Sequence, residues 1–173
     1  LNDAAATLPN SYNSVENITP LETPLSSTIN GAALATPVFL SLYAENDLRL
    51  DKYFAETDEK GFRKNKKAGS NNYLCTFRVG EIYLTAAEAA ARLGELSQAR
   101  TRLLELMRKR YAPEAYEAKS VVVNAMDKEA LVQEILDERA RELAFEGHRW
   151  FDLRRYAVCE KYPYSKQIRH AFN

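Results

Sequence analysis

Residues 138–155 constrain the fold of this chain more than any other stretch of its sequence. Arginines and acidic residues alternate there with large apolar side chains, so a helical segment cannot place every charge in water and every apolar group in a core. Some ion pairs must therefore be partly buried, and a buried ion pair persists only with good geometry and additional hydrogen bonds. We predict an ion-pair network that joins helices. Its expected members are Glu138, Arg139, Glu142, Glu146, Arg149, Asp152 and Arg154.

The alternative interpretation of this stretch is a catalytic carboxylate pair. Glu138 and Glu142 lie one helical turn apart, and two carboxylates can act as acid and base on a glycosidic bond across a cleft. Arginines flank both glutamates, however, and would hold them ionised, whereas a general acid needs a raised pKa. We therefore favour a structural role and expect no catalytic residue.

Length and charge limit the function classes. A chain of 173 residues can form one compact domain with a hydrophobic core. Its formal net charge is zero, so it lacks the basic surface of a nucleic-acid-binding protein, and we expect no nucleic-acid partner. No apolar run approaches the roughly 20 residues that span a bilayer. The chain begins Leu-Asn-Asp-Ala without an export signal, and we expect a processed or truncated product.

No metal site or cofactor is expected. Cys75 and Cys159 are far apart, fit no metal-ligand spacing and are expected to be unpaired thiols. His148 lacks neighbouring ligands in helical spacing and is expected to be a packing histidine. The sequence also lacks a nucleophile motif and a phosphate-binding glycine loop.

The first half of the chain reads as loops and short elements. Residues 1–36 are rich in Asn, Ser, Thr and Pro and predict an extended loop, which is long for a compact domain. Short helices are predicted within 38–43 and 46–54, and a loop or weak hairpin within 57–72. The organisation that we expect is one mainly α-helical domain, with loops and short helices in 1–75, a helical scaffold in 76–157 and a tail in 158–173.

Helical periodicity begins near Thr76, which we predict as the N-cap of a helix that ends at Gly94. Ser97 is predicted to cap a second helix that reaches Tyr111 and is ended by Pro113. Alanines in the first helix let the two helices pack closely, so the pair resembles a tetratricopeptide hairpin, although no second copy follows at an offset of 34 residues.

The remaining scaffold is predicted in three parts. Residues 112–126 are expected to be a connector. Asp127 is expected to cap a third helix that continues through Glu146. Gly147 then breaks the chain before a short helix over 148–157.

Tyrosines outside the strong helices are the candidate ligand contacts, because a tyrosine ring can stack on a sugar while its hydroxyl forms hydrogen bonds. The alternative is that these rings pack against the edge of a core. Within the 1–40 loop, Tyr12 is the first aromatic residue, and it is our candidate ligand-binding residue.

Several stretches resemble the SusD/RagB family of outer-membrane nutrient-binding lipoproteins of Bacteroidetes. Residues 138–155, which read E-R-A-R-E-L-A-F-E-G-H-R-W-F-D-L-R-R, are similar to the signature of that family. Further similar stretches occur in the same order as in the family. They are residues 43–50, with Asp47-Leu48-Arg49, residues 77–89, and the pair Arg108 and Arg110.

The resemblance implies that the chain is the C-terminal part of a larger protein with tetratricopeptide-like helix pairs. It implies non-catalytic binding of glycans or other nutrients at the external face of the outer membrane. The nutrient would pass to a TonB-dependent, SusC-like transporter, and an N-terminal lipid, absent from this chain, would anchor the protein. The signature motifs would belong to the scaffold, and the ligand residues to loops.

Two rival functions remain open at this point. A tetratricopeptide-type scaffold would bind a partner protein in a concave groove and would have no affinity for sugars. A glycoside-processing enzyme would turn over its substrate and lose that activity when Glu138 or Glu142 is changed.

Overall fold

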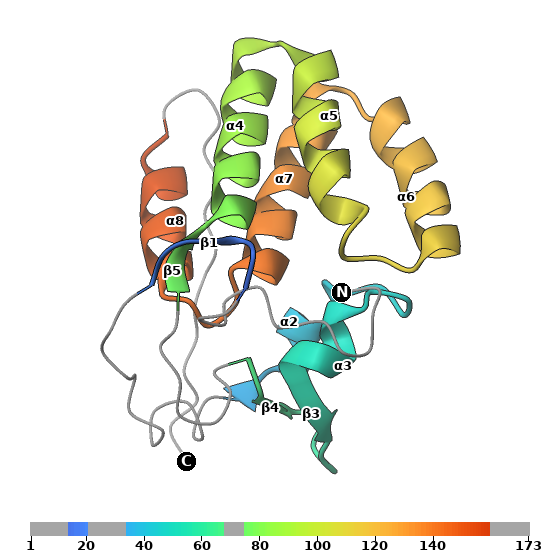
Figure 1. Ribbon diagram of the computed structural model, residues 1–173, viewed down its shortest axis with the longest axis vertical. Helices are drawn as coiled ribbons and strands as arrows, with labels where there is room; N and C mark the ends of the chain where they lie inside the picture. Colours follow the sequence, from blue (N-terminus) through green and yellow to red (C-terminus); the bar gives the residue numbers. More distant parts are fainter. Residues whose placement is uncertain (1–13, 21–33, 68–74, 160–173) are drawn as a thin grey trace.

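The computed structural model describes residues 14–20, 34–67 and 75–159. Most of the described chain is helical, which confirms the predicted mainly α fold. Figure 1 shows the longer helices gathered in one part of the molecule and two short helices with a small sheet in the other. No helix among the described residues is long and apolar enough to cross a membrane.

The first helical hairpin consists of α4 (Val79–Leu93) and α5 (Leu96–Met107). Gly94 ends α4 in the left-handed conformation, with φ of 90°, as its position predicted. Buried alanines of α4, including Ala87 and Ala91, let α5 lie close against it. The predicted N-caps are wrong. Thr76 lies in strand β5 (Cys75–Arg78), and Ser97 lies inside α5, which Glu95 precedes.

The predicted connector over residues 112–126 is wrong, because this segment forms helix α6 (Pro113–Ala125). Pro113 begins α6 and does not end α5, which already stops at Met107. Proline suits the first turn of a helix, where its missing N–H would have no intrahelical partner. Only Val123 of α6 is buried, so the segment shows little of the apolar periodicity that identifies a helix from sequence.

Helix α7 (Lys128–Glu142) packs against α4 and carries the first part of the signature stretch, residues 138–142. Asp127 caps it as predicted, with its side chain accepting a hydrogen bond of 2.9 Å from the Ala130 N–H. The helix ends four residues before Glu146, the predicted end. Gly147 then adopts φ of 88° and starts α8 (His148–Ala157) in a new direction, as predicted.

Strand pairing replaces part of the predicted loop over residues 1–36. Strand β1 (Asn17–Pro20) pairs antiparallel with β5, and β2 (Leu34–Ala35) joins a three-stranded antiparallel sheet. That sheet has the order β2-β4-β3. It contains a hairpin whose first strand lies mostly before residues 57–72, where a loop or weak hairpin was predicted. Its other strands are β3 (Phe54–Thr57) and β4 (Arg63–Asn65). The short helices are α2 (Pro37–Leu40) and α3 (Arg49–Tyr53).

The described residues form two hydrophobic clusters, and the C-terminal end of α7 reaches both. The larger cluster lies among α4, α5 and α7 and includes Leu84, Leu103 and Ile135. The smaller one packs aromatic residues near the sheet, including Tyr53 and Phe54, and also takes in Ala144, just beyond α7. The residues that follow Ile135 in α7 therefore lie where the two clusters meet.

Candidate functional site

The last turns of α7 carry a buried row of acidic residues. Glu138 and Glu142 are one turn apart on one face of the helix, and Glu146 follows in the turn before α8. Their side chains are essentially inaccessible to solvent. The cations that meet them come from α3, the end of β5, the segment after α5 and the segment after β4. They are Arg49, Arg78, Arg110 and Lys67.

Glu142 lies at the centre of this network and contacts three arginines. Its Oε2 accepts hydrogen bonds from Arg49 Nη1 at 3.0 Å and from Arg110 Nε at 2.9 Å. Its Oε1 accepts from Arg78 Nη1 at 2.5 Å and from Arg110 Nη2 at 2.9 Å. One carboxylate thus joins three guanidinium groups from three separate parts of the chain.

Glu138 extends the network toward α3. Arg49 donates from Nη1 to Glu138 Oε1 at 2.7 Å, and Arg141 donates from Nε to Glu138 Oε2 at 2.7 Å. Arg49 also pairs with Asp47 through two side-chain hydrogen bonds, of 2.7 Å and 2.9 Å. Because these donors use several oxygens at once, the buried charges are neutralised with good geometry, as a buried ion pair requires.

Glu146 extends the network toward the small sheet. Arg78 donates to it from Nε and Nη2, both at 2.9 Å, and the ammonium group of Lys67 pairs with its Oε1. Lys67 Nζ also donates to the main-chain oxygens of Glu142 and Ala144, where α7 ends. A cation at this end of a helix offsets the partial negative charge of the last carbonyls. Burial lowers the pKa of Lys67 to about 8.

All three glutamates have lowered pKa values. Burial alone would raise them, but neighbouring cations more than offset this effect. The pKa of Glu142 is held well below its ordinary value by Arg110 and Arg78. Arg49 and Arg141 lower that of Glu138, and Lys67 and Arg78 lower that of Glu146. Since a general acid at neutral pH needs a raised pKa, this cluster has the wrong electrostatics for glycosidic acid catalysis.

We expect the free energy of unfolding to fall as the pH drops below about 4.5, the ordinary pKa of a glutamate. A carboxylate with a lower pKa in the folded state stabilises the fold above its unfolded pKa. That stabilisation is lost as the pH falls through the folded pKa. Urea unfolding followed by circular dichroism between neutral pH and about pH 3 would measure it. A stability independent of pH over this range would contradict the burial of these charges.

A second ion-pair cluster joins α7 to α8 and α4. Arg139 donates to both carboxylate oxygens of Asp152 at 3.2 Å and to the hydroxyl of Thr85 at the same distance. Asp152 also accepts from Arg155 Nε at 3.0 Å, and Arg155 contacts both oxygens of Glu88 at 2.7 Å. Arg139 and Asp152 are therefore paired, but not within the network around Glu142.

Arg149 and Arg154, which the sequence analysis placed in the ion-pair network, form no ion pair with any described residue. Arg154 lies on the exposed side of α8. Arg149 lies in the first turn of α8, where its Nη1 atom is buried and has no hydrogen-bond partner in the described structure.

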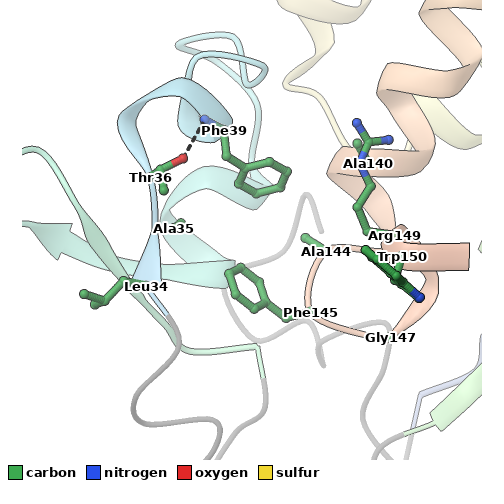
Figure 2. A pocket seen from close by; sticks show the side chains of 10 residues that line it. All are labelled: Leu34, Ala35, Thr36, Phe39, Ala140, Ala144, Phe145, Gly147, Arg149 and Trp150. Carbon is green, nitrogen blue, oxygen red and sulfur yellow. Dashed lines mark hydrogen bonds between the residues drawn. The ribbon is translucent and has the colours of Figure 1, made fainter. Parts of the chain in front are cut away.

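Arg149 lines a cavity of about 370 Å³ between α2 and the start of α8 (Figure 2). One wall comes from Leu34, Ala35, Thr36 and Phe39, joined by the ring of Phe145 from the turn after α7, and the other from the end of α7 and the start of α8. Figure 2 shows Phe39 and Phe145 on one side and the side chains of Arg149 and Trp150 on the other. Most of the lining is apolar, and among the described residues Arg149 supplies its only charged side chain.

Phe145 holds an unusual backbone conformation at this cavity. Its φ of 61° is in the left-handed region, which is strained for a large side chain without a compensating contact. The ring packs edge-to-face with Phe39 and Phe54, at centroid distances of 6.3 Å and 6.0 Å. These aromatic contacts offset part of the strain and fix the turn that presents Gly147 and Arg149 to the cavity.

The other sequence candidates have separate outcomes. Tyr12 lies outside the described residues, and so does most of the 1–40 loop. Tyr43 and Tyr53 are buried in the smaller hydrophobic cluster. Cys159 is a free cysteine, while the side chain of Cys75 is not described. His148 Nδ1 lies 3.6 Å from Glu81, and no group of potential ligands among the described residues could hold a metal ion.

Comparison with known proteins decides the family. The SusD family profile matches residues 32–171. The chain belongs to the SusD family. It is also 32% identical over 110 residues to "SusD-like protein P38" of Formosa agariphila. This alignment covers 63% of the chain but 20% of that relative, so the chain matches about one fifth of the relative's length.

The stretches that resemble the SusD family meet in the buried network. Residues 43–50 supply Arg49, residues 77–89 supply Arg78, the basic pair supplies Arg110, and the signature supplies the glutamates. These three arginines were not predicted as network members, although each lies within a stretch that resembles the family. Lys67 lies outside those motifs in a basic segment, and no sequence signal identified it as a buried residue.

Proposed function

We propose that this SusD-family chain takes part in non-catalytic binding of glycans or other nutrients at the cell surface. The nutrient would be delivered to a TonB-dependent, SusC-like transporter. Family membership supports this role, as does the state of the acidic residues. Every glutamate of the α7 row is paired with arginine or lysine, and its pKa is lowered. A buried carboxylate held ionised in this way joins separate segments of the chain through its ion pairs.

We further infer that the chain is the C-terminal part of a larger protein and forms a single domain there. The relative that it matches is several times longer than the aligned segment, which supports this inference. Such a protein would act at the external face of the outer membrane. A lipid at its N-terminus would anchor it there. The scaffold described here would position the loops that contact the nutrient, with Tyr12 as the first aromatic candidate.

Binding without turnover is the expected result when the protein is mixed with a panel of soluble oligosaccharides. Calorimetry would measure binding, and chromatography of the same mixtures would detect products. Glu138→Gln is the diagnostic variant, and Glu129→Gln, on the exposed side of the same helix, is its control. New saccharide products that disappear in a folded Glu138→Gln protein would show an enzyme. Binding of peptides in the absence of any saccharide binding would favour the tetratricopeptide-type scaffold.

A further inference from the structure

The cavity between α2 and α8 has the features of a binding site for a small anion with an apolar body. Its volume of about 370 Å³ falls within the range of about 300–1,000 Å³ typical of small-molecule sites. It is also formed by segments about 100 residues apart in the chain, which fixes its walls through the fold. We propose that it binds a compact carboxylate with an aromatic or branched aliphatic group, independently of any glycan.

The walls favour an apolar group. Phe39 and Phe145 face the cavity from one side and Trp150 borders the other, and Ala140 and Ala144 leave space between them (Figure 2). The indole of Trp150 is about 60% exposed, an unusual state for the largest apolar side chain of the protein. Aromatic rings that pack edge-to-face or offset against a guest ring contribute beyond simple burial of area.

The polar groups favour an anion. Arg149 Nη1 is buried without an acceptor among the described residues, and leaving such a donor unsatisfied carries a desolvation cost. The nearby glutamates of the α7 row are already neutralised by their own arginines and lysine. Among the described lining residues, the Arg149 guanidinium is thus the charge that a ligand carboxylate could pair with.

The N-terminus of α8 also favours an anion. Gly147 is the N-cap residue, has no side chain to cap the helix, and lines the cavity with Arg149 and Trp150. The first N–H groups of a helix have no intrahelical acceptor and carry partial positive charge. The first turn of α8 also contains no acidic residue. The carboxylate of His148's partner, Glu81, lies on the α4 side and does not line the cavity.

A glycan fits this lining less well than an apolar carboxylate. The side chains that could bond hydroxyl groups are Thr36, Arg149 and the Trp150 indole, and the Thr36 hydroxyl already accepts from the Phe39 N–H at 3.2 Å. A sugar would place many hydroxyls against aromatic and alanine side chains, where each would lose its hydrogen bonds to water. The described lining therefore suits an apolar carboxylate better than a glycan.

Trp150 provides a direct readout, because it is the only tryptophan of the chain and borders the cavity. The probes are 3-phenylpropionate and its neutral analogue 3-phenylpropionamide, titrated into the protein while tryptophan fluorescence is recorded. We expect the carboxylate to shift the emission with a dissociation constant about tenfold or more below that of the amide, since the Arg149 guanidinium pairs more strongly with a charged carboxylate than with a neutral amide.

Variants of Arg149 distinguish the contribution of its charge to binding from that of the apolar lining. Arg149→Leu should weaken carboxylate binding about tenfold or more and leave amide binding nearly unchanged, whereas Arg149→Lys should retain most of the preference. Arg154→Leu, on the exposed side of the same helix, is the matched control and should bind like the parent protein. Thermal unfolding followed by circular dichroism checks that each variant is folded.

Three results would overturn the proposal. They are equal binding of the acid and the amide, an unchanged affinity of a folded Arg149→Leu protein for the acid, and no fluorescence change at millimolar probe. None of them bears on saccharide binding, so the nutrient proposal stands or fails on its own titration. Conversely, a protein that binds no saccharide could still bind phenylpropionate in this cavity.

Discussion

Replacing Glu142 with alanine is expected to lower the free energy of unfolding by about 3–5 kcal/mol, and to leave little folded protein if the parent is only marginally stable. The reason is geometric. Glu142 accepts hydrogen bonds from Arg49, Arg78 and Arg110, and all four side chains are inaccessible to solvent or nearly so. Removal of the carboxylate leaves three buried guanidinium groups that the other glutamates neutralise only in part.

Two further variants test this explanation for Glu142. Glu142→Gln keeps the shape and one acceptor oxygen but removes the charge, so it should recover only part of the loss. Glu105→Ala removes an exposed ion pair with Arg102 and should cost less than about 1 kcal/mol. Urea denaturation of the three variants at neutral pH measures the differences. A midpoint for Glu142→Ala equal to that of Glu105→Ala would refute a structural role for the network.

The sequence allowed the existence of buried ion pairs to be inferred, but not most of their partners. Residues 138–155 contain too many charges and too many apolar groups for a simple amphipathic helix, and this local excess is visible without a structure. Which cations reach Glu142 depends instead on how α3, β5 and the segment after α5 approach α7. Arg49 and Arg110 are 93 and 32 residues away from it in the chain, so no local spacing links them.

Predictions of element boundaries succeeded where the signal is local and failed where the boundary depends on tertiary contacts. Gly94, Asp127 and Gly147 were correctly interpreted because each carries its signal in its own backbone or side-chain chemistry. Helix α6 was missed because its sequence has weak periodicity and buries one residue. Thr76 was misassigned as a cap because pairing of β5 with β1, a tertiary contact, extends the strand to Arg78.

The cavity could not have been predicted from either of its walls alone. Phe39 belongs to a short apolar run, and Arg149 belongs to a charged stretch in which every arginine had a candidate partner nearby. The left-handed turn at Phe145 and Gly147 rotates α8 relative to α7, and it separates Arg149 from the glutamates. The backbone conformation of Phe145 and Gly147 thus places Arg149 beside the cavity and not in the ion-pair network of α7.

Replacing Arg139 with alanine is expected to lower the free energy of unfolding by about 3–5 kcal/mol, because Asp152 would lose its bidentate partner in a nearly buried position. Asp152 would keep Arg155, so the cost should lie toward the lower end of that range. If the loss reflects the carboxylate left behind, Arg139→Ala combined with Asp152→Ala should be less destabilising than the sum of the two single variants. Arg154→Ala, on the exposed side of α8, should change stability by less than about 0.5 kcal/mol. Urea midpoints of the parent protein and these four variants test the cycle and its control. An unchanged midpoint for Arg139→Ala would mean that α8 is held to the scaffold by its apolar contacts and not by this ion pair.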